Sequence, residues 1–143
     1  MGKINTGRVI IGGLVAGIVG DIFGYLVDGL WLAPQWNDGM KALGRTEIGA
    51  SQILWFNVIG LVLGIATIWI YAGIRPRFGA GPKTAVLAGL AVWIVGALLP
   101  NFSSMWVSGL FSHSLTVMTT IGALVGTLVA AVAGAAVYKE PAV

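Results

Sequence analysis

Long apolar runs alternate with short polar segments along this chain. Four runs, at about 7–32, 51–74, 84–108 and 114–138, contain very few charged residues. A helix that crosses a membrane needs about 20 predominantly apolar residues, and each run is at least that long. The pattern therefore predicts an all-α integral membrane protein, in which residues 1–143 form a single domain with a bundle of four transmembrane helices.

The third run contains a proline, Pro100, followed by the polar residues Asn101, Ser103 and Ser104. Proline removes a backbone donor and its ring clashes with the preceding turn, so a helix either kinks there or ends. Of these alternatives we expect the helix to end near Leu99. The third span would then be 84–100, and 101–113 would form a separate interfacial or half-buried segment.

The first connection, 33–50, has its own helical pattern. Trp36, Met40 and Leu43 recur at helical spacing, which predicts a short helix lying in the membrane interface. Tryptophan is enriched where a membrane meets water. Four tryptophans are expected near this surface: Trp31, Trp36, Trp55 and Trp106.

The basic residues are distributed unevenly between the two sides of the predicted bundle. One side has only Lys41 and Arg45, which Asp38 and Glu47 balance. Because Lys and Arg accumulate in cytoplasmic segments, the other side should be cytoplasmic and should hold both termini. That side carries Lys3, Arg8, Arg75, Arg77, Lys83 and Lys139.

The overall composition supports the membrane assignment. Of 143 residues, 57% are hydrophobic and 9% are charged, and the mean hydropathy is +0.93. A soluble domain carries about a quarter charged residues, so a soluble globule, a disordered chain and a nucleic-acid-binding protein are all excluded. The expected partners are membrane lipids and either further copies of the chain or other membrane subunits, with no nucleic acid.

Small residues recur at intervals of four within the apolar runs. Lipid is as apolar as the helices themselves, so close approach through small residues has to supply the contact that holds helices together. These GxxxG-type faces either make the internal contacts of one bundle or include an interface to another subunit. The predicted packing positions are Gly13, Gly17, Gly20, Gly24, Gly60, Gly64, Gly122 and Gly126.

Two aspartates lie inside the first run, Asp21 near its middle and Asp28 in its outer third. They are seven positions apart and therefore share a helix face. An aspartate at the centre of a membrane helix costs about 2.5–3.5 kcal/mol on insertion scales, which suggests a function and a partner. The predicted intramembrane polar network contains Asp21, Tyr25, Asp28, Asn57, Thr67, His113, Thr116 and Thr120.

Motifs of known enzyme chemistry are not found in the sequence. It contains no HExxH, no P-loop and no cysteine or histidine cluster for a metal. We therefore expect a non-catalytic protein with neither metal nor cofactor. A bound lipid, a quinone or a single pigment at His113 is the alternative for a cofactor, although a polar cap at the interface is the simpler role for this histidine.

The segment from Gly29 to Pro34, with the later Trp36, Met40 and Gly44, resembles part of a known group of proteins. These are uncharacterised bacterial four-helix membrane proteins, grouped as a domain of unknown function, which have a Trp-Tyr-x-Pro-like turn followed by a Trp and a Gly. Here Trp31-Leu32-Ala33-Pro34 lacks the tyrosine, and the similarity covers about twenty residues. The resemblance implies a multi-pass protein of the bacterial inner membrane and supplies no activity.

Two functions remain compatible with these observations. The first is a small packing or accessory subunit of a larger membrane assembly, in which the polar residues form a structural network. The second is a small oligomeric transporter, coupled to protons or ions, that uses Asp21 and Asp28. The sequence favours the accessory subunit and leaves the transporter as the alternative.

Overall fold

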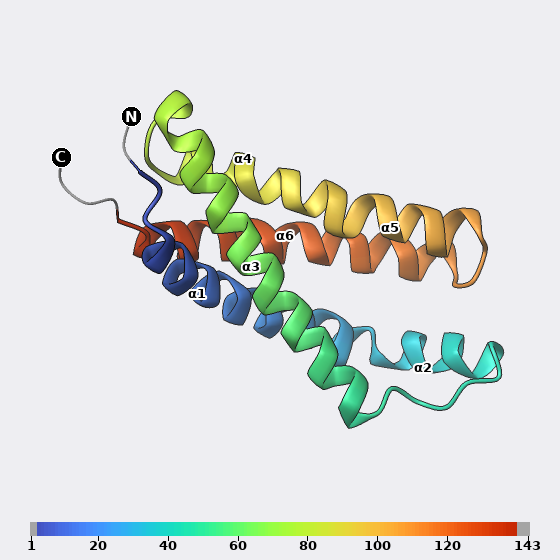
Figure 1. Ribbon diagram of the computed structural model, residues 1–143. Coiled ribbons are helices and arrows are strands. Elements are labelled where there is room, and N and C mark those ends of the chain that lie inside the picture. Colours follow the sequence, from blue (N-terminus) through green and yellow to red (C-terminus); the bar gives the residue numbers. More distant parts are fainter. Residues whose placement is uncertain (1–2, 140–143) are drawn as a thin grey trace.

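The computed structural model describes residues 3–139, and all the regular elements in this range are helices (Figure 1). Within it, four helices are long and apolar enough to cross a membrane: Thr6–Trp31, Ala50–Phe78, Pro82–Val107 and His113–Val137. The predicted all-helical class and the four candidate spans are therefore confirmed. The first turn of the first span and the last turn of the fourth lie together, and we call this the terminal end of the bundle.

The first span consists of α1 (Thr6–Gly24) and the π-helical segment η1 (Tyr25–Trp31). Asn5 caps α1, because its side-chain oxygen accepts a hydrogen bond of 3.1 Å from the backbone N–H of Arg8. A short helix, α2 (Ala33–Ala42), follows in the first connection. Its place at a membrane interface stays a prediction, and we call the end of the bundle where it lies the α2 end (Figure 1).

The second span is one helix, α3 (Ala50–Phe78), which turns back into α4 (Pro82–Trp93) through a short connection. Two glycines make this turn, Gly79 with φ +84° and Gly81 with φ +127°. Glycine adopts positive φ at little cost because it has no Cβ. Pro82 then starts α4 at a position where a missing N–H does no harm.

The third span continues past Pro100, so the expectation that it ends near Leu99 is wrong. After α4 come the π-helical segment η2 (Ile94–Leu98), the single turn α5 (Leu99–Asn101) and the π-helical segment η3 (Phe102–Val107). The N–H of Leu99 donates to the carbonyl of Ile94, five residues earlier. This wider turn makes room for the proline ring, which would clash in a regular α-helix.

Residues 101–113 accordingly do not form a separate segment. Residues 102–107 belong to the third span, and a short turn leads into α6 (His113–Val137). Ser112 caps α6, because its hydroxyl oxygen accepts a hydrogen bond of 3.2 Å from the N–H of Leu115.

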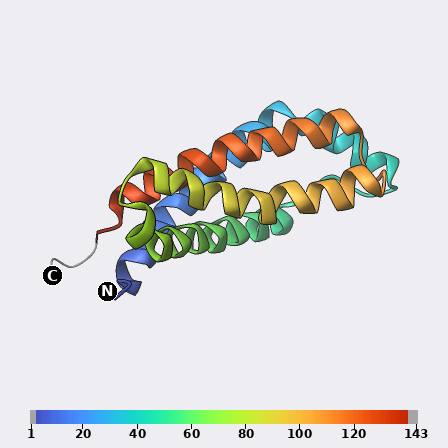
Figure 2. The same ribbon diagram turned by 90° about the horizontal axis from the view of Figure 1, so that it is seen from above.

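The spans pack around the bundle in the order α1, α3, α4, α6, with α1 also in contact with α6 (Figure 2). The main core lies in the half towards the terminal end, where small side chains let the helices approach closely. Its buried members are Val9, Ala16, Ile68, Tyr71, Ala72, Ala85, Ala88, Ala130, Ala135 and Tyr138.

Packing is looser in the half towards the α2 end. Every residue from 51 to 59 on α3 is exposed, and α3 diverges from α1 and from the third span in this half (Figure 1). A second, smaller core lies there, formed by Leu32 between η1 and α2, Met105 of η3 and Leu115 of α6. The bundle is thus closed around its main core and opens along α3 beyond it.

Candidate functional site

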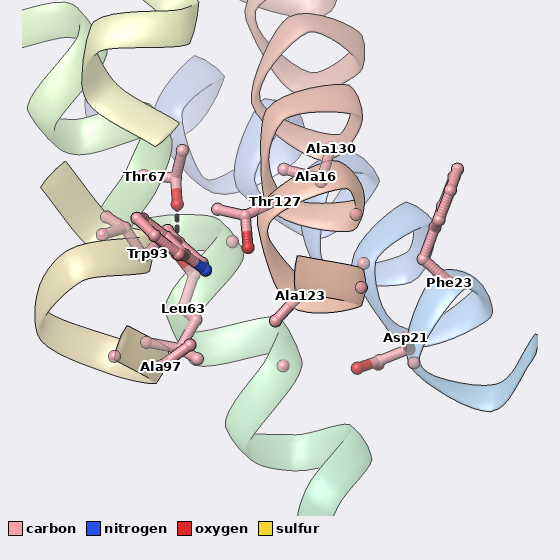
Figure 3. Close-up of a pocket in the computed structure, with 18 of the residues that line it drawn as sticks. Ala16, Asp21, Phe23, Leu63, Thr67, Trp93, Ala97, Ala123, Thr127 and Ala130 are labelled. Carbon is pink, nitrogen blue, oxygen red and sulfur yellow. Dashed lines mark hydrogen bonds between the residues drawn. The ribbon is translucent and has the colours of Figure 1, made fainter. Parts of the chain in front are cut away.

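A cavity of about 340 Å³ lies between the spans where the packing begins to loosen. All four spans contribute to its walls, with Asp21 from α1, Leu63 from α3, Trp93 from α4 and Thr127 from α6 (Figure 3). Its lining is mostly apolar, and the described residues that form it include no lysine, arginine or histidine. It is therefore an apolar space with acidic groups and no basic group to neutralise them.

The carboxylate of Asp21 points from α1 towards α3 (Figure 3) and packs against Gly60. A Cβ at position 60 would lie 2.8 Å from Cγ of Asp21 and closer still to Oδ1, so only glycine leaves room for this carboxylate. Within residues 3–139, no group donates a hydrogen bond to Asp21. The sequence suggested Asn57, the threonines, water or a proton as its partners, and neither Asn57 nor a threonine reaches it.

Asp28 also lines the cavity, but its environment differs. Its Oδ1 accepts a hydrogen bond of 2.7 Å from the hydroxyl of Thr119 on α6 and one of 3.0 Å from the indole N–H of Trp36 on α2. Thr119 and Trp36 were both absent from the predicted network. Both residues carry a donor that can be read from the sequence. However, they are 91 and 8 residues away from Asp28 along the chain, and these separations do not indicate a contact.

A second polar cluster lies around Thr120 on α6, and it too contains residues that the sequence did not single out. The Thr120 hydroxyl accepts a hydrogen bond of 3.0 Å from the side-chain amide of Asn101, and its carbonyl accepts one of 2.9 Å from the indole N–H of Trp93. Asn101 reaches α6 because the third span continues beyond Pro100. The cluster joins the third and fourth spans and holds the ring of Trp93 in place beside the cavity.

The remaining members of the predicted network do not join it. Thr67 and Thr116 donate to backbone carbonyls of Leu63 and Ser112, four residues earlier in the chain, and the amide of Asn57 does the same with Ile53. Short polar side chains on helices often find such local acceptors. These residues therefore make local hydrogen bonds and none to the aspartates.

Tyr25 and His113 lie at the surface of the bundle. The Tyr25 side chain is 61% exposed. The ring of His113 stacks on Trp106, with centroids 3.8 Å apart and an angle of 13° between the planes. Neither residue lines the cavity, so the predicted single network is in fact two separate hydrogen-bonded clusters and one isolated carboxylate, that of Asp21.

Glycines hold α1 against α3. A Cβ at Gly17 would lie 2.6 Å from the Cα of Leu61, and a Cβ at Gly13 would lie closer still to the Cα of Ile65. On the opposing helix, Gly64 lies directly against the backbones of Gly13 and Gly17. Such backbone contact is the way in which small residues join membrane helices.

The other predicted packing glycines divide into two groups. Gly122 and Gly126 on α6 lie against the first span, where a Cβ would be 2.6 Å from Cγ1 of Val27 and 2.9 Å from Cβ of Phe23, respectively. A Cβ at Gly20 would make only an ordinary contact, and one at Gly24 would meet nothing within 4 Å. Gly20 and Gly24 instead line the cavity, where the missing side chains leave its volume open.

The part of the chain that the structure describes holds no group of three or more His, Cys, Asp or Glu residues that could bind a metal ion. Comparison with models of known protein families, with curated proteins and with solved structures finds no match. A carboxylate without donors in an apolar cavity can take up a proton or a cation.

Proposed function

We propose that this protein is a small, non-catalytic membrane transporter that takes up protons or a cation at Asp21. The observation that supports this proposal is the position of the Asp21 carboxylate: it faces a cavity between all four spans, and no described group donates a hydrogen bond to it. Acidic groups inside membrane helices characteristically mark ion pathways and proton relays.

The contrast with Asp28 is the main argument against a purely structural role for Asp21. A carboxylate that serves to join helices should be hydrogen-bonded to its neighbours, as Asp28 is to Thr119 and Trp36. Asp21 has no such donors and still lies towards the middle of its span, where an aspartate is costly. A carboxylate kept in the span at that cost, without hydrogen-bond donors, is suited to bind a proton or a cation reversibly.

The transporter would lie in the bacterial inner membrane with both termini in the cytoplasm. This orientation follows from the distribution of Lys and Arg, and the membrane from the resemblance around Trp31 and Trp36. The α2 end would then face the periplasm. Because four spans rarely enclose a complete pathway, the transporter would act as an oligomer.

A second candidate is an accessory subunit of a larger assembly. The observation that favours it is the exposed face of α3 between residues 51 and 59, which includes the polar side chain of Asn57. A polar amide on an exposed face of a membrane helix gains from a neighbouring protein that can hydrogen-bond to it. In this case Asp21 would have no role in transport.

Proton flux into liposomes tests the first candidate. Wild type, Asp21→Asn and Asp38→Asn would be compared at matched incorporation, with Asp38 as the control because it is an exposed residue of α2, outside the spans. Asparagine keeps the shape of aspartate but does not titrate, so flux should disappear only in Asp21→Asn. Absence of both proton flux and cation uptake from wild type at every pH would refute the transporter, and co-purification with other subunits in mild detergent would then favour the second candidate.

A further inference from the structure

The cavity at Asp21 has the size and lining of a site for a small organic molecule. Its volume of about 340 Å³ falls within the range of about 300–1,000 Å³ for small-molecule pockets, which are mostly apolar with a few polar groups that orient the ligand. Here the apolar walls include the aromatic ring of Trp93 and the side chains of Leu63 and Val92. A proton alone would need no such space.

The charge of the ligand follows from the polar groups of the cavity. Asp28 already has two donors on Oδ1, and the hydroxyl of Thr67 donates to the carbonyl of Leu63. Within residues 3–139, Asp21 is the acidic group of the cavity left without a donor, and no basic residue of this range lines the cavity to neutralise it. The neutral donors stabilise the carboxylate of Asp28, so the position left for a positive charge of the ligand is the one at Asp21.

An inorganic cation fits this lining poorly. Such ions are held by several oxygen ligands that replace their water, whereas most of the residues around the cavity are Gly, Ala, Val, Leu, Phe and Trp. A cation with an apolar body sheds little hydration energy and gains from the same walls. An aromatic face such as that of Trp93 also attracts a cation directly.

We propose, on the basis of the transporter function above, that the cavity binds a monovalent organic cation with an apolar body, the charge lying at Asp21 and the body towards Trp93 and Thr127. Figure 3 shows these two side chains across the cavity from Asp21. The indole N–H of Trp93 is already engaged with the carbonyl of Thr120 at 2.9 Å, so its ring is held as a fixed wall.

Equilibrium dialysis with radiolabelled benzyltriethylammonium tests this site in the purified full-length protein in mild detergent. Saturable binding is measured for wild type, Asp21→Asn and Asp38→Asn, with empty micelles as the blank for partition into detergent. Loss of the ionic partner should weaken binding by about tenfold or more in Asp21→Asn, and Asp38→Asn should match wild type. Ala123→Leu keeps the charge and fills part of the cavity, so it should weaken this cation but not the smaller tetramethylammonium.

The outcomes separate this site from the proposed function. Saturable binding that needs Asp21 and is blocked by bulk at Ala123 supports the organic-cation site. No saturable binding, together with proton flux that still depends on Asp21, overturns the organic cation and leaves the transporter intact. Equal binding to wild type and Asp21→Asn places the ligand elsewhere and also overturns the proposal. Absence of both binding and flux refutes both.

Discussion

The hydroxyl of Thr119 on α6 donates a hydrogen bond of 2.7 Å to the carboxylate of Asp28 in η1, although 91 positions separate the two residues in the chain. Trp36 donates to the same oxygen, so Asp28 joins the first span to both α6 and α2. Asp21, seven positions earlier on the same span, accepts no hydrogen bond from any residue that the structure describes. The two aspartates therefore differ in their surroundings: Asp28 is hydrogen-bonded to two other helices, whereas Asp21 faces the cavity.

Removal of the Thr119 hydroxyl should weaken the α2 end of the bundle slightly. Thr119→Val keeps the shape of the side chain and takes away one of the two donors to Asp28. Interhelical hydrogen bonds in membranes contribute about 0.6 kcal/mol on average, so a small loss of unfolding free energy in detergent is expected. Thr119→Ser keeps the hydroxyl and should stay closer to wild type. If the valine variant were as stable as wild type, the hydrogen bond would not contribute to the stability of the bundle.

Gly60→Ala should disturb Asp21 more than the bundle. The added methyl group would collide with the Asp21 carboxylate, which is the end of a flexible side chain and can move aside. We expect the flux and cation binding that depend on Asp21 to fall while thermal stability changes little. Gly73→Ala is the matched control on α3, because a Cβ there would meet nothing within 4 Å. Equal activity in the two variants would argue against the placement of the carboxylate over Gly60.

Gly64→Ala should instead destabilise the whole bundle. Its Cβ would press on the backbones of Gly13 and Gly17, and the backbone of a packed helix cannot move aside as a side chain can. Overpacking of this kind costs about 1–3 kcal/mol, which thermal unfolding in detergent can measure. The Gly73→Ala control serves here as well, and a Gly64→Ala protein as stable as that control would show that α1 and α3 do not pack through these glycines.

Labelling from outside the cell should distinguish the two ends of the bundle. The chain has no cysteine, so single cysteines at Asp38 and at Phe78 provide unambiguous sites, and both residues are exposed. If both termini are cytoplasmic, an impermeant maleimide should label position 38 in intact cells and position 78 only after lysis. The reverse pattern would invert the proposed orientation.

The sequence by itself determined the spans and their approximate bounds. Hydropathy is a local property that is compared with a fixed membrane thickness, so each run could be judged without its neighbours. The prediction at Pro100 is wrong because a proline ring clashes in a regular α-helix but not in the helix that the chain forms there. The widened turn at Ile94–Leu98 accommodates the ring, and the local sequence contains no pattern that predicts such a turn.

Only the tertiary structure decided which polar residues have partners. The sequence grouped Asp21 and Asp28 by their shared face, but it contained no information on which face of α6 or α3 lies opposite each of them. Thr119 lies across from Asp28, whereas Gly60, which has no side chain to donate, lies across from Asp21. Partnership depends on how helices distant in the sequence are rotated against each other, and that rotation is set by close glycine contacts such as those between Gly64 and Gly17.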